Sequence, residues 1–175
     1  MDVNNDLLKD SIWVDTETTG LTPGYDEMLQ ISLIDYHGNV LMNEYIKPKR
    51  ATNWPEAEAV NGISPEMVES CQTIDHFLPE MQKLFNKAHL IGGYNTWFDI
   101  RFLLASGLEP NGQKVIDVMK EFAKIYGEWN DYFDDYKWQK LSVCADYYGY
   151  EFQAHNSLED IKATLYCYKK MMQIQ

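Results

Sequence analysis

Apolar and polar positions in the first part of the chain predict three strands. SIWVD (11–15) is a short apolar run that ends in a carboxylate and is followed by the turn-rich segment TETTGLTPG, which is typical of a buried strand that delivers Asp15 to a loop. LQISLID (29–35) and VLMNEYI (40–46) lie on either side of His37-Gly38-Asn39, so we expect a hairpin there. Together the three strands predict an antiparallel meander.

Beyond residue 47 the pattern changes to helical spacing. Ser64-Pro65-Glu66 resembles a helix start, with Ser64 as the cap and Pro65 at the first helical position. Apolar residues recur at helical spacing over 74–87 and predict an amphipathic helix. Next come a short buried strand (89–95) and a helix that Gly107 stops (97–107). A brief strand or strand-to-helix junction follows (114–119), and then two helices separated by Gly149 (138–148 and 157–172).

This order of elements predicts the fold class α/β, with helices covering a mixed sheet. The acidic, aromatic stretch 128–137 has no clear period and is interpreted as a surface loop or irregular connection. A length of 175 residues with 45% hydrophobic and 24% charged residues fits a single domain, 1–175, with a core of about 11–172.

Composition also indicates the cellular compartment in which we expect the protein to work. No apolar run approaches the roughly 18–20 residues that span a bilayer. The polar N-terminus MDVNNDLLKDS is unlike a signal or transit peptide, so we expect a cytoplasmic protein. Cys71, Cys144 and Cys167 are far apart and form no CxxC pair, which predicts reduced, partly buried thiols.

The balance of acidic and basic residues limits the classes of ligand that we expect the protein to bind. The chain has 15 basic and 27 acidic residues, a net charge of −12, which argues against a broad basic face that grips nucleic acid. It fits an enzyme of small ligands, or a site where divalent cations neutralise substrate phosphates. The sparse basic residues are interpreted as a solvated face, with a phosphate track as the alternative: Lys47, Lys49 and Arg50 in one group, and Lys162, Lys169 and Lys170 in another.

Candidate chemistry begins with Asp15 and Glu17. They lie two residues apart, so in extended backbone their side chains leave the same face. Carboxylates held that close repel each other unless a cation lies between them, and Mg²⁺ typically binds one or two carboxylates together with waters and phosphate. An exposed acidic pair at a strand end is the alternative.

Two further clusters open predicted helices. Asn95 is a good cap type, and Asp99 follows it in the first turn, where a carboxylate also complements the helix dipole. Asn156 or Ser157 can cap the last helix, and His155 precedes that helix and can fold back toward Asp160. A histidine beside an activated water is suited to act as a general base, the alternative being a surface histidine.

The segments DTETTGL, NTWFD and HNSLED, in that order, resemble the three motifs of the DEDDh branch of DnaQ-like 3′–5′ exonucleases. The resemblance runs from about Ile12 to about Met172, and AEAVNGISPEMV (57–68) resembles the family's loop before the first long helix. It implies a ribonuclease-H-like mixed sheet flanked by helices. It also implies hydrolysis of phosphodiester bonds at nucleic-acid 3′ ends, with release of nucleoside 5′-monophosphates.

The same resemblance implies roles for single residues. Asp15 would share two Mg²⁺ ions, with Mn²⁺ able to substitute. Glu17 and Asp160 would complete the first ion's site, Asp99 would serve the second, partly through water, and His155 would take the proton of the attacking water. Four carboxylates against two divalent ions leave a nearly neutral site, which would let a chain of charge −12 accept a phosphate.

Residues around these motifs are the expected substrate contacts. Gly20 permits close backbone approach, and Leu21 would contact the terminal base, with a local turn contact as the alternative. Phe98 and Phe102 would either pack in the core or stack on a base. Asn61 stands where many relatives have His, so it keeps hydrogen-bonding capacity but carries no charge. The full predicted set is Thr18, Gly20, Leu21, Asn61, Asn95, Phe98 and Phe102.

The sequence leaves several functions open. A free-standing 3′–5′ exonuclease acting on single-stranded or frayed 3′ ends is favoured. A proofreading-type subunit docked on a DNA polymerase, a catalytically silent binding module and a metal-dependent phosphatase for small anions are the alternatives. No motif distinguishes DNA from RNA, because that choice depends on a few contacts at the 2′-position.

Overall fold

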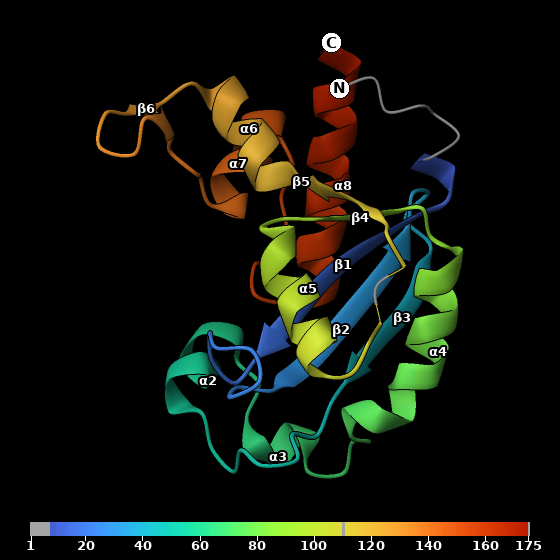
Figure 1. The fold of residues 1–175 in the computed structure, drawn as a ribbon. Helices are drawn as coiled ribbons and strands as arrows, with labels where there is room; N and C mark the ends of the chain where they lie inside the picture. The colour runs from blue at the N-terminus through green and yellow to red at the C-terminus, as the bar shows by residue number, and fades with distance from the viewer. Residues whose placement is uncertain (1–7, 110, 175) are drawn as a thin grey trace.

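The computed structural model describes residues 8–109 and 111–174. Within these residues a five-stranded sheet in the order β3-β2-β1-β4-β5 forms the centre of the molecule (Figure 1). Its strands are β1 (Ser11–Thr18), β2 (Met28–Asp35), β3 (Val40–Tyr45), β4 (Leu90–Gly93) and β5 (Lys114–Asp117). β1 to β3 are antiparallel neighbours, whereas β4 and β5 run parallel to β1. The predicted mixed sheet and meander are confirmed.

Helices pack around this sheet. They are α2 (Pro55–Asn61), α3 (Pro65–Val68), α4 (Ile74–Lys87), α5 (Thr96–Ala105), α6 (Val118–Tyr126), α7 (Leu141–Tyr148) and α8 (Ser157–Ile174). The amphipathic helix predicted over 74–87 is confirmed in full as α4. Gly149, with a φ of 72°, ends α7 in the left-handed conformation that glycine adopts without steric cost.

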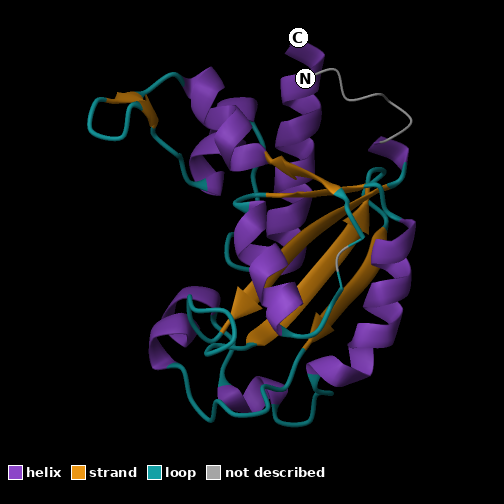
Figure 2. Ribbon diagram, viewed as in Figure 1, coloured by secondary structure: helices purple, strands orange, loops and turns teal. Residues whose placement is uncertain are grey.

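Three details of the sequence interpretation are corrected. The segment 57–68 is not simply a loop, because Pro55 starts the short helix α2 and left-handed Gly62 ends it. The stretch 128–137 contains a small hairpin, β6 (Trp129–Asn130) and β7 (Asp135–Tyr136), which projects from the α6–α7 end of the molecule (Figure 2). β1 continues through Thr18, so Asp15 lies within a strand and not in a loop.

The two faces of the sheet carry separate parts of the core. Ile12 and Val14 point to the side that packs against α4 and α5, whereas Trp13 packs with Tyr168 and other residues of α8. A side chain at Gly92 would place its Cβ 2.6 Å from the Trp13 ring, so β4 needs glycine there. Figure 1 shows α5 and α8 on opposite sides of β1, and the strand alternation therefore decides which helix each β1 side chain faces.

Other expectations concern the chain as a whole. Cys71, Cys144 and Cys167 are free thiols, the last two of them buried, as predicted. Among the described residues, the helices are too short or too polar to cross a membrane. The interpretation of the polar N-terminus falls mainly on residues 1–7, which lie outside the described part of the chain.

Candidate active site

β1 presents two carboxylates to the α8 side of the sheet. Asp15 and Glu17 alternate with Thr16, and they therefore share the face of Trp13. In the register with β2, Asp15 lies opposite Ser32 and Glu17 opposite Gln30. The predicted same-face arrangement of the two carboxylates follows directly from the strand period.

Hydrogen bonds hold the start of α8 against β2, opposite these carboxylates. The buried hydroxyls of Ser157 and Ser32 are hydrogen bonded at 2.6 Å, and the Ser157 amide donates to Gln30 Oε1 at 3.4 Å. These contacts bring Asp160 to β1. One carboxylate oxygen from each of Asp15, Glu17 and Asp160 lies within 4.8 Å of the others, which is a spacing that a single cation can bridge.

Asp99 reaches the same site from α5. Its side chain is only 2% exposed, and its Oδ1 accepts a hydrogen bond of 2.8 Å from the Thr16 hydroxyl. Asn95 precedes α5 in the left-handed conformation, with a φ of 58°, and its side chain makes no capping bond, contrary to the expected role. Its backbone amide donates to Asp117 Oδ1 at 3.0 Å, so Asp117 supports the turn that leads to Asp99.

His155 lies beside Asp160 at the mouth of the site. Its φ of 68° folds the chain back, and its backbone amide donates to Asp160 Oδ2 at 3.3 Å. The side chain is exposed to solvent. Asn156 caps α8 through Oδ1, which accepts the amides of Leu158 and Glu159. His155 therefore stands immediately before a capped helix, as the sequence predicts.

Burial and mutual repulsion disfavour the charged form of every carboxylate here. Burial raises the pKa of Asp15 most, and Asp99, Asp160 and Glu17 raise it further. Burial together with Asp160 raises the pKa of Glu17 to about 7. Burial raises the pKa of Asp99 to about 8 and that of Asp160 to about 6. Groups that resist ionisation in this way need a compensating cation.

The donor set fits a hard divalent cation. It consists of carboxylate oxygens, the ligands that Mg²⁺ prefers. Asp160 Oδ1 is buried and has no hydrogen-bond partner among the described residues, so it is free to ligate. Asp15, Glu17 and Asp160 could hold one ion, and Asp99, which interacts electrostatically with Asp15 and Glu17, could help to hold a second.

The turn after β1 holds the first group of predicted substrate contacts. The Thr18 hydroxyl donates to the Gly20 carbonyl at 2.6 Å, which orders the turn. A Cβ on Gly20 would lie 2.6 Å from the Asp26 carboxyl group, so this glycine makes room for Asp26. Leu21 is 80% exposed and accessible to a ligand. Asn61 Nδ2 donates to the Thr18 carbonyl at 3.3 Å, and the same side chain hydrogen bonds Glu17.

The aromatic residues near Asp99 separate into buried and accessible ones. Phe102 is 1% exposed and belongs to the core, with its ring centre 4.9 Å from that of the half-buried Phe98. Trp97 is exposed. The structure thus leaves more surface for a base contact at Phe98 than at Phe102, and both contacts stay predictions.

The basic groups are largely occupied by protein partners. Lys49 pairs with Asp75 at 2.6 Å and Lys162 with Glu159 at 3.0 Å. Lys169 and Lys170 lie over the rings of Tyr36 and Tyr166. Arg50 pairs with Glu27 at 3.8 Å, and it also lines several surface hollows close to the turn after β1.

Sequence reasoning missed the supporting residues of the site. Ser32, Gln30 and Asp117 lie in strands, where they read as ordinary polar positions. For Ser32 and Gln30 the one local signal is that they are polar residues within an otherwise apolar run. In the structure this run is β2, and all of it is buried except its last residue. A buried polar residue needs a hydrogen-bond partner, but the sequence does not say which one.

Fold and site together define a DnaQ-like exonuclease on a ribonuclease-H-like fold. The sequence profile of the exonuclease family RNase_T matches residues 12–168, and the chain belongs to this family. The resemblance drawn from the three motifs is therefore confirmed.

Individual relatives agree with this assignment. The chain is 34% identical over 172 residues to an uncharacterized exonuclease, CP81, of Escherichia phage 186, covering 91% of this chain and 86% of the relative. It is 27% identical to RNA exonuclease 4 of Gibberella zeae, covering 91% of this chain and 48% of that protein. It is 30% identical to the PolC-type DNA polymerase III of Thermotoga maritima, covering 92% of this chain but 12% of the polymerase.

A solved structure shows the same fold. Exonuclease I of E. coli in complex with a dA16 oligonucleotide superposes with a TM-score of 0.77 at 23% identity. The match covers 94% of this chain and 41% of exonuclease I.

Proposed function

We propose that this protein is a metal-dependent 3′–5′ exonuclease that hydrolyses the terminal phosphodiester bond of a nucleic acid and releases a nucleoside 5′-monophosphate. The observation that carries the proposal is the cluster of Asp15, Glu17 and Asp160, whose carboxylate oxygens lie within 4.8 Å of one another. Membership of an exonuclease family supports the reaction class.

The carboxylates hold the cofactor in this proposal. Asp15 would help to hold both divalent ions, Glu17 and Asp160 would complete the site of the first, and Asp99 would serve the second. Two bound Mg²⁺ ions, or Mn²⁺ in their place, supply Lewis-acid activation of water and neutralise charge on the phosphate and the leaving oxygen. The hydroxyl bond between Ser157 and Ser32 holds α8 against β2, and β2 pairs with β1, so these ligands are kept in place without substrate.

His155 acts as the general base. Its imidazole is exposed, and His155 directly precedes on the chain the residues that place Asp160. A neutral ring nitrogen of His155 accepts the proton of the attacking water, a task suited to the pKa range of histidine. The terminal nucleotide is held by the turn after β1 and its neighbours: Thr18, Gly20, Leu21, Asn61, Asn95 and Phe98.

The substrate in this proposal is a single-stranded or frayed 3′ end. A terminal base has to leave its stack to reach a site built into the sheet edge, and exposed apolar side chains such as Leu21 can receive it. The relatives include an RNA exonuclease and a DNA polymerase, so both DNA and RNA are candidate substrates.

A second candidate function is favoured by one relative. The chain matches 12% of a PolC-type DNA polymerase III, which supports the alternative that this domain proofreads beside a DNA polymerase. The chemistry is the same, but activity would then rise when the polymerase is present.

The test is a time course on 5′-labelled single-stranded DNA and RNA of matched sequence, with Mg²⁺, Mn²⁺ or EDTA. We expect a ladder that shortens from the 3′ end with either ion, disappears in EDTA, and is lost in Asp15→Asn. Asp131→Asn, an exposed carboxylate on the distant hairpin, is the matched control and should retain activity. Full activity of Asp15→Asn would refute the site, and no cleavage by the wild type would favour a docked subunit or a silent binding module.

A further inference from the structure

A surface hollow of about 360 Å³ lies beside the turn that follows β1. One wall is the loop Thr19–Asp26 and the other is the segment Arg50–Asn53. Thr19 directly follows the last residue of β1, so the hollow begins two residues beyond Glu17. Its volume falls within the range of about 300–1,000 Å³ that is usual for ligand pockets.

The two walls are tied together at their base. The Glu27 carboxylate accepts the backbone amides of Lys49, Arg50 and Ala51 at 2.8, 2.9 and 2.9 Å. Arg50 Nη2 donates to the carbonyls of Gly24 and Tyr25 at 2.9 and 3.2 Å. The loop that carries Tyr25 is therefore held in place before any ligand binds.

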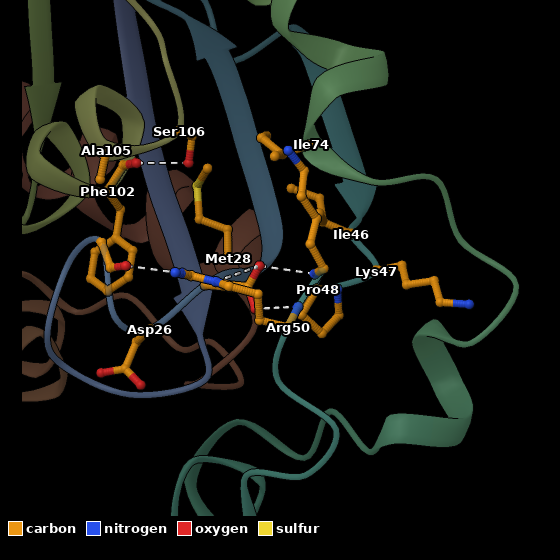
Figure 3. A pocket seen from close by; sticks show the side chains of 13 residues that line it. Asp26, Met28, Ile46, Lys47, Pro48, Arg50, Ile74, Phe102, Ala105 and Ser106 are labelled. Carbon is orange, nitrogen blue, oxygen red and sulfur yellow. Dashed lines mark hydrogen bonds and ion pairs between the residues drawn. The ribbon is translucent and has the colours of Figure 1, made fainter.

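Arg50 stands between two hollows. Figure 3 looks into the adjoining one, of about 290 Å³, where the Arg50 side chain crosses from the segment around Pro48 toward the loop of Asp26. The Arg50 side chain is 62% exposed, and its Nε forms an ion pair of 3.8 Å with Glu27 Oε1. Its Nη1 group makes no hydrogen bond within the described part of the chain, so the Nη1 edge of the guanidinium group is available to an anion.

The chemistry of the hollow matches a nucleotide. The Tyr25 ring is 81% exposed and offers a stacking surface, while Thr52 and Asn53 offer polar side chains. The one carboxylate on the wall is directed into its own loop, because Asp26 accepts the Thr22 amide at 2.8 Å and the Thr19 hydroxyl at 3.5 Å. An aromatic ring, a guanidinium group and short polar groups are what a base and its phosphate require.

We propose that this hollow binds the nucleotide immediately 5′ of the one being removed, with its base on Tyr25 and the phosphate on its 5′ side facing Arg50. This subsite rests on the proposed exonuclease function, and it extends the contact with the strand beyond the terminal nucleotide. It explains how a chain of charge −12 holds a strand upstream of the metal site with very few basic residues.

Three substrates separate the subsite from the reaction centre. The p-nitrophenyl ester of thymidine 5′-monophosphate has the terminal nucleotide but no upstream one. The thymidine dinucleotide adds the upstream nucleoside, and the 5′-phosphorylated dinucleotide adds the upstream phosphate. Values of kcat/KM are measured for all three with Mg²⁺ on the full chain.

Removing the Tyr25 ring should slow the hydrolysis of the dinucleotides relative to that of the ester. In Tyr25→Ala we expect the kcat/KM ratio of dinucleotide to ester to fall about tenfold, in line with the effect of losing one base–ring stack. Tyr25→Phe should restore the ratio, because the ring remains. Tyr132→Ala removes an equally exposed tyrosine from the distant hairpin and should keep the wild-type ratio.

Removing the charge of Arg50 should reduce the gain in kcat/KM that the upstream 5′-phosphate provides. In Arg50→Gln we expect most of the gain from the 5′-phosphate to disappear, and the salt dependence of log kcat/KM for the phosphorylated dinucleotide to weaken, because salt screens the pairing of a charged side chain with a phosphate. A merely structural role of Arg50 in holding the Tyr25 loop would not change these two readouts. Lys83→Gln, an exposed charge on α4, is the control.

The outcomes distinguish the two proposals. If the wild type hydrolyses none of the three substrates, the proposed function fails. If it hydrolyses all of them but gains nothing from the upstream nucleoside, or Tyr25→Ala keeps the wild-type ratio, the function stands and the subsite is overturned.

Discussion

At the residue scale, the site brings together carboxyl groups, each of which makes ionisation of the others less favourable. Asp15, Glu17 and Asp99 all have raised pKa values, and each is raised first by burial and then by a neighbouring carboxylate. Such a cluster destabilises a metal-free protein and becomes favourable when a cation binds. This mutual repulsion is the physical reason to expect that the cluster binds a metal ion.

His155 provides the sharpest test of an individual role. It is close to Asp160 through its backbone amide, but its imidazole is exposed and outside the carboxylate cluster. His155→Ala should therefore slow hydrolysis by about 10²–10⁴-fold, the usual contribution of a general base, and leave Mg²⁺ affinity in calorimetry near the wild-type value. His89→Ala, which removes another exposed imidazole, should retain activity. A parallel loss of Mg²⁺ affinity in His155→Ala would make His155 part of the metal site.

At the element scale, the start of α8 controls the geometry of the site. Asn156 lies between His155, the proposed general base, and Asp160 along the chain, and its Oδ1 accepts the amides of Leu158 and Glu159 at 3.2 and 3.3 Å. Its carbonyl oxygen also accepts the Asp160 amide at 2.9 Å. The helix cap therefore positions both of its functional neighbours.

Removing this cap should affect stability and activity together. Asn156→Ala should lower the free energy of unfolding by about 1 kcal/mol, the typical cost of losing an N-cap, as measured by urea denaturation. It should also lower kcat, since the first turn of α8 that carries Asp160 frays. Asn156→Ser keeps a capping oxygen and should restore most of both quantities. Equal losses in the serine and alanine variants would show that the capping bond has no such role.

At the scale of the whole molecule, the carboxylate cluster links folding to pH and metal. In the folded metal-free protein the pKa values of Asp160, Glu17 and Asp99 are about 6, 7 and 8, whereas unfolded carboxyls titrate near pH 4. The folded state therefore holds more protons over this range, and its stability falls as pH rises from about 4 to about 8.

Thermal unfolding at several pH values checks this linkage. In EDTA, Tm should fall between pH 5 and pH 8, and the increase in Tm on adding Mg²⁺ should be larger at pH 8, where the ligands are ionised more easily. Asp15→Asn removes one charge from the cluster and should flatten the decline in EDTA. Glu44→Gln changes an exposed carboxylate and serves as the control. A Tm in EDTA that rises over this range in the wild type would contradict the raised pKa values.

Much of the architecture could be predicted from local pattern. The meander, the helix over 74–87 and the helices that carry Asp99 and Asp160 follow from apolar periodicity and helix-start residues, which act within a few positions along the chain. The helix α2 and the hairpin β6–β7 were missed because short elements leave few periods to recognise.

The sequence by itself determined which residues are candidates for the chemistry, since the motif residues Asp15, Glu17, Asp99, His155 and Asp160 are visible in order along the chain. Tertiary structure alone decided how they meet. The bond between Ser32 and Ser157 joins residues 125 positions apart, and the Tyr25 hollow is closed by contacts to Arg50 from another segment. Such pairings depend on strand register and helix packing, which bring distant residues together, whereas sequence patterns report only the short-range preferences of the backbone.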